Sequence, residues 1–114
     1  MDHAALLADP LTTVAHYYAS CLPDHARVTA YLQQALGMSR EQALAAGIGF
    51  ADRSLGTKLP KGILVPGRKV RNALIAVGLY KPNGRETLRG CITEPMRSSD
   101  GTVVAIRGWK LDRF

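Results

Sequence analysis

The stretch RGCITEPMRSSDGTVVAIRGWK, residues 89–110, decides the fold of this chain. Turn-forming residues at 98–101 separate two runs that are rich in apolar and β-branched side chains. This pattern predicts a β-hairpin with strands from about Arg89 to Met96 and from about Thr102 to Lys110. Pro95 has no backbone N–H to donate, so we expect it at a sheet edge or a bulge.

The second predicted strand is apolar on both faces. Side chains alternate between the faces of a strand, which places Val103, Ala105, Trp109 and Leu111 on one face and Val104, Ile106 and Lys110 on the other. We therefore expect other elements to cover this strand on both sides. A second hairpin is predicted just before it, over residues 79–90, because Pro82-Asn83-Gly84 is typical of a tight turn.

The first third of the chain has apolar residues at helical spacing. Asp9, Asp24 and Ser39 are candidate N-caps, and Gly37 and Gly47 are candidate C-terminal stops. These signals predict three helices, over about 10–22, 24–36 and 39–47.

A fourth helix is predicted over residues 68–78, with Val70, Leu74 and Val77 facing inward. The Pro- and Gly-containing segment before it predicts a loop with a brief strand at 63–65. Cations in the first turn of a helix oppose its dipole. Their presence at the start of this helix indicates either a solvated face or a binding role.

These elements define an α+β fold. We expect a three-helix lobe and one further helix to pack on a small, mainly antiparallel sheet. Residues 1–8 are expected to be a flexible N-terminus, and residues 9–114 a single domain. Within it, 9–47 form the helical lobe and 48–114 a basic α/β part.

The net charge is unevenly distributed along the chain. Residues 1–50 carry −2 and residues 51–114 carry +8, which together make the overall charge of +6. A basic half predicts an electrostatic surface for a polyanion, although a solvated basic surface has the same composition. Cations with aromatic neighbours are typical of single-strand grooves. The candidate nucleic-acid-binding residues are Arg68, Lys69, Arg71, Arg85, Arg89, Arg107, Trp109 and Lys110.

Composition excludes several other classes. No apolar run approaches the ~20 residues that span a bilayer, and the N-terminus lacks the pattern of a signal peptide. We therefore expect a cytoplasmic protein without a membrane partner. Cys21 and Cys91 are expected to be reduced thiols.

Catalytic candidates are few. Cys91 could act as a nucleophile if Arg89 and Arg97 lowered its pKa, but the second half of the chain has no histidine to serve as its base. A cysteine in a strand is more typical of a core position. We predict no catalytic residue in this segment.

A metal site is also not expected. His16, Cys21 and His25 have the spacing of three ligands, but Pro23 interrupts them and a structural zinc site needs a fourth.

Two segments of the chain carry a family resemblance. The first contains Tyr31-Leu32, Gly37-Met38-Ser39 and Gly47-Ile48-Gly49-Phe50-Ala51, and the second contains Arg89-Gly90, Pro95, Gly101 and Gly108 with Lys110. In this order they resemble bacterial DnaG-type DNA primases, especially the primase-like proteins of mobile elements. The similarity is to the N-terminal subdomain of the RNA-polymerase core, between the zinc-binding and TOPRIM domains. It covers about Leu11 to Leu111.

The resemblance implies a part in RNA primer synthesis during DNA replication. This subdomain would bind the single-stranded DNA template and the RNA–DNA primer through basic residues. By position the role falls on Arg89 and Lys110, while Arg68, Arg71 and Arg107 are neighbours by charge.

Three positions depart from the family pattern. Ala35-Leu36 precede Gly37 where the family often has Arg, and Cys91 lies near a second basic position. Trp109 replaces an Arg expected after Gly108. These departures imply a weaker hold on phosphates, or one partly replaced by stacking on Trp109.

The zinc and magnesium of the family belong to the zinc-binding and TOPRIM domains, which these 114 residues do not resemble. We therefore expect no cofactor in this segment and no primer synthesis by it alone, and whether it is part of an enzyme stays open. A replicative helicase and those two domains are the implied protein partners. The alternative is an interaction module that docks a helicase or the TOPRIM domain.

Overall fold

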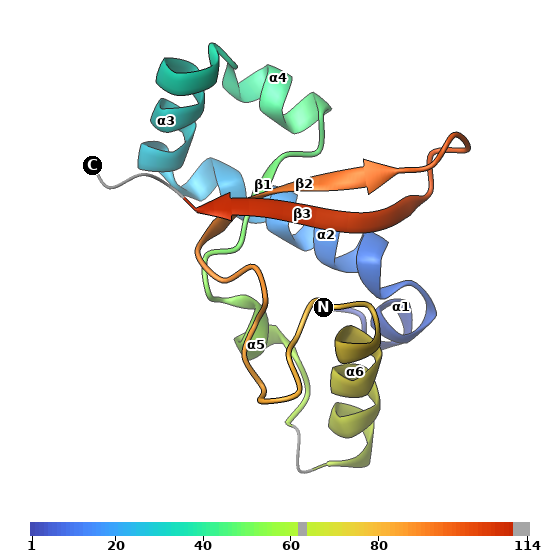
Figure 1. The fold of residues 1–114 in the computed structure, drawn as a ribbon. Helices are drawn as coiled ribbons and strands as arrows, with labels where there is room; N and C mark the ends of the chain where they lie inside the picture. The colour runs from blue at the N-terminus through green and yellow to red at the C-terminus, as the bar shows by residue number, and fades with distance from the viewer. Residues whose placement is uncertain (62–63, 111–114) are drawn as a thin grey trace.

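The predicted hairpin forms the centre of the computed structural model, which describes residues 1–61 and 64–110 (Figure 1). Strand β2 (Cys91–Arg97) pairs antiparallel with β3 (Val103–Lys110). The short strand β1 (Gly49–Phe50) pairs antiparallel with the other edge of β2. The sheet order is therefore β1-β2-β3.

Pro95 lies in the part of β2 that pairs with β3 but not with β1. Strand β1 reaches only as far as Thr93, so β2 is open on that side beyond this residue. The prediction of an edge or bulge at Pro95 is confirmed. The register between β2 and β3 shifts after Met96, so that Arg97 pairs with Val103 and Val104 is skipped.

The α+β fold class is confirmed. Besides the sheet, the described residues form six α-helices and one 3-10 turn: α1 (His3–Ala8), α2 (Pro10–Cys21), the turn Leu22–Asp24, α3 (Ala26–Leu36), α4 (Arg40–Ala45), α5 (Leu55–Lys58) and α6 (Val65–Ala76). Of these helices, none in the described part of the chain has the length and apolar character needed to cross a membrane.

Three of the predicted capping residues set helix ends in the structure. The Asp9 carboxylate accepts from the backbone N–H of Thr12 at the start of α2 (3.1 Å). Ser39 and Gln42 form a reciprocal capping box on α4. Gly37 ends α3 in the left-handed conformation with φ +63°. The prediction for Asp24 is wrong: it ends the 3-10 turn, and His25 occupies the N-cap position of α3.

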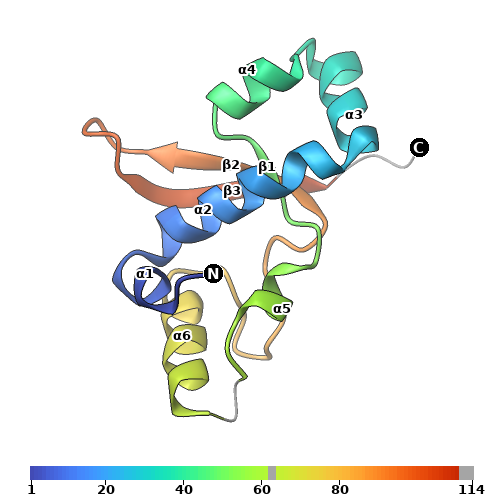
Figure 2. The same cartoon turned by 180° about the vertical axis from the view of Figure 1, so that it is seen from behind.

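Helix α2 crosses one face of the sheet, as Figure 2 shows from behind. The approach is close at Gly49, where a Cβ atom would lie 2.4 Å from the carbonyl carbon of Tyr18. Only glycine allows β1 to lie this near the α2 backbone. In the view of Figure 1, helices α3 and α4 lie above the sheet, and α1, α5 and α6 lie below it.

Two apolar clusters make the core. The larger lies around α1, α2, α5 and α6 and includes Leu6, Val14, Tyr18, Leu55, Val70 and Leu74. The smaller joins α3 and α4 to the sheet and consists of Leu22, Val28, Leu32, Ala43, Ile48 and Ile92. Helix α2 and the turn after it contribute to both clusters, so this segment connects the two halves of the molecule.

The N-terminus differs from the expected flexible tail. Residues His3–Ala8 form α1, whose N-cap Asp2 accepts from the backbone N–H of Ala4. Leu6 is fully buried in the larger cluster. This helix has only six residues and buries a single leucine. Its sequence therefore shows no repeated apolar spacing from which a helix could be predicted.

The segment before the fourth predicted helix also differs. Helix α6 begins at Val65, with Leu64 as its N-cap, so these two residues are not in a strand. Ile63, the first residue of that predicted strand, lies outside the described residues. Val70 and Leu74 are buried as predicted, but Val77 is 37% exposed because the helix ends before it. Helix α6 packs mainly against α1 and not on the sheet.

The prediction that β3 is covered on both sides is wrong. Val104 is 55% exposed and Ala105 is also exposed, although Val103 is buried. Helix α2 covers one face, whereas α3 and α4 reach the other face only near Trp109. Leu111, which belonged to the same prediction, lies outside the described residues.

Candidate nucleic-acid interface

The predicted basic residues lie at two places in the fold. Five belong to α6 and the segment that follows it beside α5 (Figure 1): Arg68, Lys69, Arg71, Arg85 and Arg89. Arg107, Trp109 and Lys110 lie on β3. All of these cations are exposed except Arg71, which is half-buried.

The segment 79–90 forms the predicted turn but little strand. Tyr80 pairs with Glu86 as a single bridge. Lys81 N–H donates to the Arg85 carbonyl (2.8 Å), and Gly84 at φ +86° closes the turn. This turn places the Arg85 side chain in solvent.

Tyr80 lies next to these cations, but its burial excludes a base-stacking role. It is 6% exposed and belongs to the larger apolar cluster. The Arg71 guanidinium lies over its ring, 6.0 Å from the centroid. Arg71 is therefore held by a cation–π contact, while Arg68 and Lys69 extend from the same helix into solvent.

Arg107 is held by an acidic neighbour across the sheet. Its Nε and Nη2 atoms both donate to Glu94 Oε1, each at 2.6 Å. The pairing follows from the register, which sets Glu94 opposite Arg107. This arginine is therefore largely neutralised, unlike Lys110 at the end of the same strand.

Arg89 and Arg97 do not activate Cys91. Burial raises the pKa of the Cys91 thiol, and Lys110, its partner across the strands, is the cation that opposes this. Arg97 instead donates to the Gly101 carbonyl in the hairpin turn (3.2 Å). A buried thiol with a raised pKa is a poor nucleophile. Both cysteines are free and buried, as expected of reduced core thiols.

A polar network that the sequence did not predict connects α2 to the start of α3. His25 Nε2 donates to Asp52 Oδ2 (2.9 Å), and Asp52 Oδ1 accepts from the Ser54 hydroxyl (2.5 Å). The Tyr17 hydroxyl hydrogen-bonds to Ser54 Oγ, and Cys21 Sγ lies 3.9 Å from the same atom. Asp52 and Ser54 lie 27 to 37 residues after the residues of α2 and the N-cap of α3 that they contact, so periodicity and spacing gave no signal for these contacts.

The hydrogen bonds of this network hold the segments together and do not activate any of its groups. Burial would raise the pKa of Asp52, but hydrogen bonds from Ser54 and His25 outweigh it and lower that pKa. The carboxylate is therefore a weak base, and it hydrogen-bonds to the imidazole through one oxygen and to the hydroxyl through the other. Burial also raises the pKa of Cys21. The arrangement does not make an activated nucleophile.

No group of three metal-ligating side chains gathers anywhere in residues 1–61 and 64–110. His16 is exposed on α2, whereas Cys21 is buried and His25 is engaged by Asp52. The residues present therefore do not fit a metal ion at this place.

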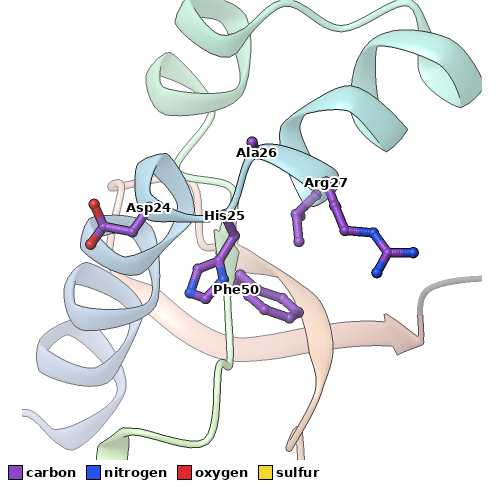
Figure 3. Close-up of a pocket in the computed structure, with 6 residues that line it drawn as sticks. Asp24, His25, Ala26, Arg27 and Phe50 are labelled. Carbon is purple, nitrogen blue, oxygen red and sulfur yellow. The ribbon is translucent and has the colours of Figure 1, made fainter.

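A pocket of about 370 Å³ opens at the start of α3 (Figure 3). The Phe50 ring and the His25 imidazole meet edge to face in it, with centroids 4.9 Å apart. Figure 3 shows the Arg27 side chain extending beside Phe50 on the other side. The pocket is thus bordered by an aromatic ring, an imidazole and a cation.

Another pocket, of about 310 Å³, lies at the other end of α3 and is lined by Leu32, Leu36, Met38, Ile48, Glu94, Arg107 and Trp109. Leu36, of the pair Ala35-Leu36, and Trp109 belong to two of the departures from the family pattern described above. The tertiary structure brings these two departures to one place, although they are far apart in the sequence.

Comparison with known proteins gives one structural likeness. No family model and no curated protein matches this chain. A solved structure described as the DnaG primase catalytic domain bound to ssDNA shares the fold, with a TM-score of 0.68 and 22% sequence identity. The match covers 98% of this chain and 37% of that chain. The chain thus has the fold of about a third of that catalytic domain.

Proposed function

We propose that this chain binds single-stranded DNA as the template-binding part of a DnaG-type primase. The observation that carries the proposal is the shared fold with a primase catalytic domain that was solved with ssDNA. The +8 charge of residues 51–114 supports it, because phosphate contacts dominate the affinity for single strands.

The proposed contacts are electrostatic. Arg68, Lys69, Arg85, Arg89 and Lys110 have exposed side chains that can reach phosphates, and we assign most of the affinity to them. Arg71 and Arg107 contribute less because Tyr80 and Glu94 already hold them. An RNA–DNA primer would be held by the same phosphate contacts.

The proposal concerns binding and contains no catalytic step. Primer synthesis uses metal ions held by carboxylates, and the described residues do not gather such a group. In this proposal, a TOPRIM-type domain supplies the metal ions and a zinc-binding domain and a replicative helicase are further partners. The cytoplasm, where replication proteins of bacteria and their mobile elements act, is the proposed location.

The experiment is fluorescence anisotropy of a labelled single-stranded oligonucleotide at several salt concentrations. For wild type we expect log K to fall linearly with log[salt]. Arg89→Ala should reduce the slope by about 0.7, the value for one phosphate contact on a single strand.

Arg97→Ala is the matched control, because it removes the same charge from an exposed arginine that is not among the proposed contacts and that donates to the hairpin turn at Gly101. We expect its slope to equal that of wild type. Absence of binding even at low salt would contradict the proposal and favour an interaction module. Equal slopes in all three proteins would show that Arg89 makes no phosphate contact.

A further inference from the structure

The pocket between α3 and β3 combines apolar walls with one accessible indole. Leu32, Leu36, Met38 and Ile48 come from the helical side, and Trp109 comes from the sheet. Its volume of about 310 Å³ is at the lower end of small-ligand pockets, which measure roughly 300–1,000 Å³. The pocket therefore suits one small flat group and not a helix or a strand.

The strand register explains why Trp109 stays accessible. Phe50 pairs with Ile92, and Ile92 pairs with Trp109, so the three side chains form a row across one face of the sheet. Ile92 at the centre is fully buried in the cluster with Leu32. Trp109, at the end of the row on the edge strand, packs against that cluster but is only half-buried.

The charge of the pocket disfavours a phosphate. The cation among its lining residues, Arg107, is paired with Glu94 at 2.6 Å, so the wall has no net charge. A phosphate entering here would lose its hydration without gaining an unpaired cation. The uncharged, flat part of a polyanion could enter without this loss of phosphate hydration. The basic half of the chain would attract that polyanion to the protein.

We propose that this pocket receives one unstacked base of a single-stranded nucleic acid, which stacks on Trp109. The inference rests on the proposed function, and it assigns to this pocket a base contact in place of a phosphate contact. Aromatic side chains stack with any base, so the contact would be tolerant of sequence. Leu36, 53% exposed at the end of α3, would cover the edge of the base.

The test uses the fluorescence of Trp109, which is the single tryptophan of the chain. A single-stranded oligonucleotide should quench it, whereas the same backbone with abasic sites should bind without quenching. Removing the bases should weaken binding about tenfold, because one stacked base contributes about 1–3 kcal/mol.

Trp109→Ala should weaken anisotropy-measured binding by a similar factor at every salt concentration while the salt slope stays unchanged. Trp109→Phe should restore part of the affinity because it retains a ring. Leu36→Glu is a second variant at an exposed position, where the fold tolerates the change, and it should also weaken binding. Val104→Ala removes an exposed apolar side chain from the same strand and should change nothing.

The outcomes separate this inference from the proposed function. Salt-dependent binding that is identical for wild type, Trp109→Ala and the abasic oligonucleotide would overturn the base pocket and leave the proposed function standing. If no oligonucleotide binds, the proposed function fails. The pocket is then tested with nucleoside 5′-monophosphates: saturable quenching of Trp109 would support it, and unchanged fluorescence at millimolar concentration would overturn it.

Discussion

Two partly buried carboxyl groups have opposite electrostatic environments. Asp52 accepts from His25 and Ser54, and these hydrogen bonds outweigh burial and lower its pKa. Glu86 accepts from the Tyr18 hydroxyl, yet burial outweighs this bond and the charge of Arg89, and its pKa is raised. Folding stability should therefore respond to pH with opposite signs at the two residues.

For Asp52 the stabilisation should disappear in acid. Because the folded pKa is lowered, the stabilisation is present above the unfolded value of about 3.9 and is lost as pH falls through the folded pKa. Asp52→Asn should lower the free energy of unfolding by about 1 kcal/mol at pH 7, the size of a partly solvated charged hydrogen bond. Urea unfolding of both proteins from pH 7 to pH 2 measures the difference, which should shrink in acid.

The titration of Asp100 in acid does not affect the comparison of wild type with Asp52→Asn. Hydrogen bonds from Ser98 and from the backbone of Thr102 lower its pKa to about 2, but it is present in both proteins and cancels in the difference. A difference that stays constant over the whole pH range would contradict the role given to the Asp52 charge.

For Glu86 the prediction has the other sign. Because the folded pKa is raised, stability should be lost as pH rises from the unfolded value of about 4.3 through the folded pKa. Glu86→Gln keeps an acceptor for Tyr18 and removes the charge. Its Tm at pH 7 should exceed that of wild type by roughly 2–4 °C, equal to about 0.5 kcal/mol for a carboxyl that solvent still reaches.

Thermal unfolding at pH 4 and pH 7 measures this effect, and the two proteins should be close at pH 4. If Glu86→Gln were less stable than wild type at pH 7 but not at pH 4, the charge of Glu86 would be stabilising, through Arg89.

Among the elements, the contact between α2 and β1 sets the position of the sheet. Three residues separate the end of α4 from β1, and β1 itself has two residues, so the strand has little pairing of its own. Its place depends on the absence of a side chain at Gly49. A change at this residue should therefore act on the whole sheet.

Gly49→Ala should destabilise the protein by about 3 kcal/mol, because the new Cβ would meet the α2 backbone, which has little room to move. Gly56→Ala is the matched control inside α5, where the new Cβ would lie 3.5 Å from the Tyr80 hydroxyl, an ordinary contact. It should be neutral or add up to about 1 kcal/mol of helix stability. Denaturant midpoints compare the two, and equal midpoints would contradict the close approach.

At the scale of the whole molecule, two apolar clusters lie on either side of the segment formed by α2 and the turn after it. The cluster around α6 and the cluster under α3 share no buried residue. Only the second contacts the Trp109 pocket. A cavity made in the cluster under α3 should therefore change the fluorescence of Trp109, whereas a cavity made in the cluster around α6 should not.

Leu32→Ala and Leu74→Ala test this organisation, because both leucines are almost fully buried. Each should cost about 2–5 kcal/mol of stability. The emission of Trp109 in the folded protein should change in Leu32→Ala, whose side chain lines the pocket, and stay unchanged in Leu74→Ala. An equal change in both variants would show that the two clusters act as one core.

The sequence by itself determined several local features of the structure. It predicted the hairpin with Pro95 at an open edge, the α4 capping box at Ser39 and the stop at Gly37, because turn, cap and strand signals act within a few residues. For the cations at the start of α6 it indicated either a solvated face or a binding role; Arg68 and Lys69 are exposed, whereas Arg71 is half-buried over the Tyr80 ring.

Only the tertiary structure decided which residues meet. The His25–Asp52–Ser54 network, the burial of Tyr80 and the pairing of Arg107 with Glu94 depend on where α2, the sheet and α3 pack. The same packing buries Leu6 in the short helix α1, leaves Val104 exposed and places Leu36 beside Trp109. Contacts between distant segments arise from the burial of apolar faces against one another, and local propensity does not encode which faces meet.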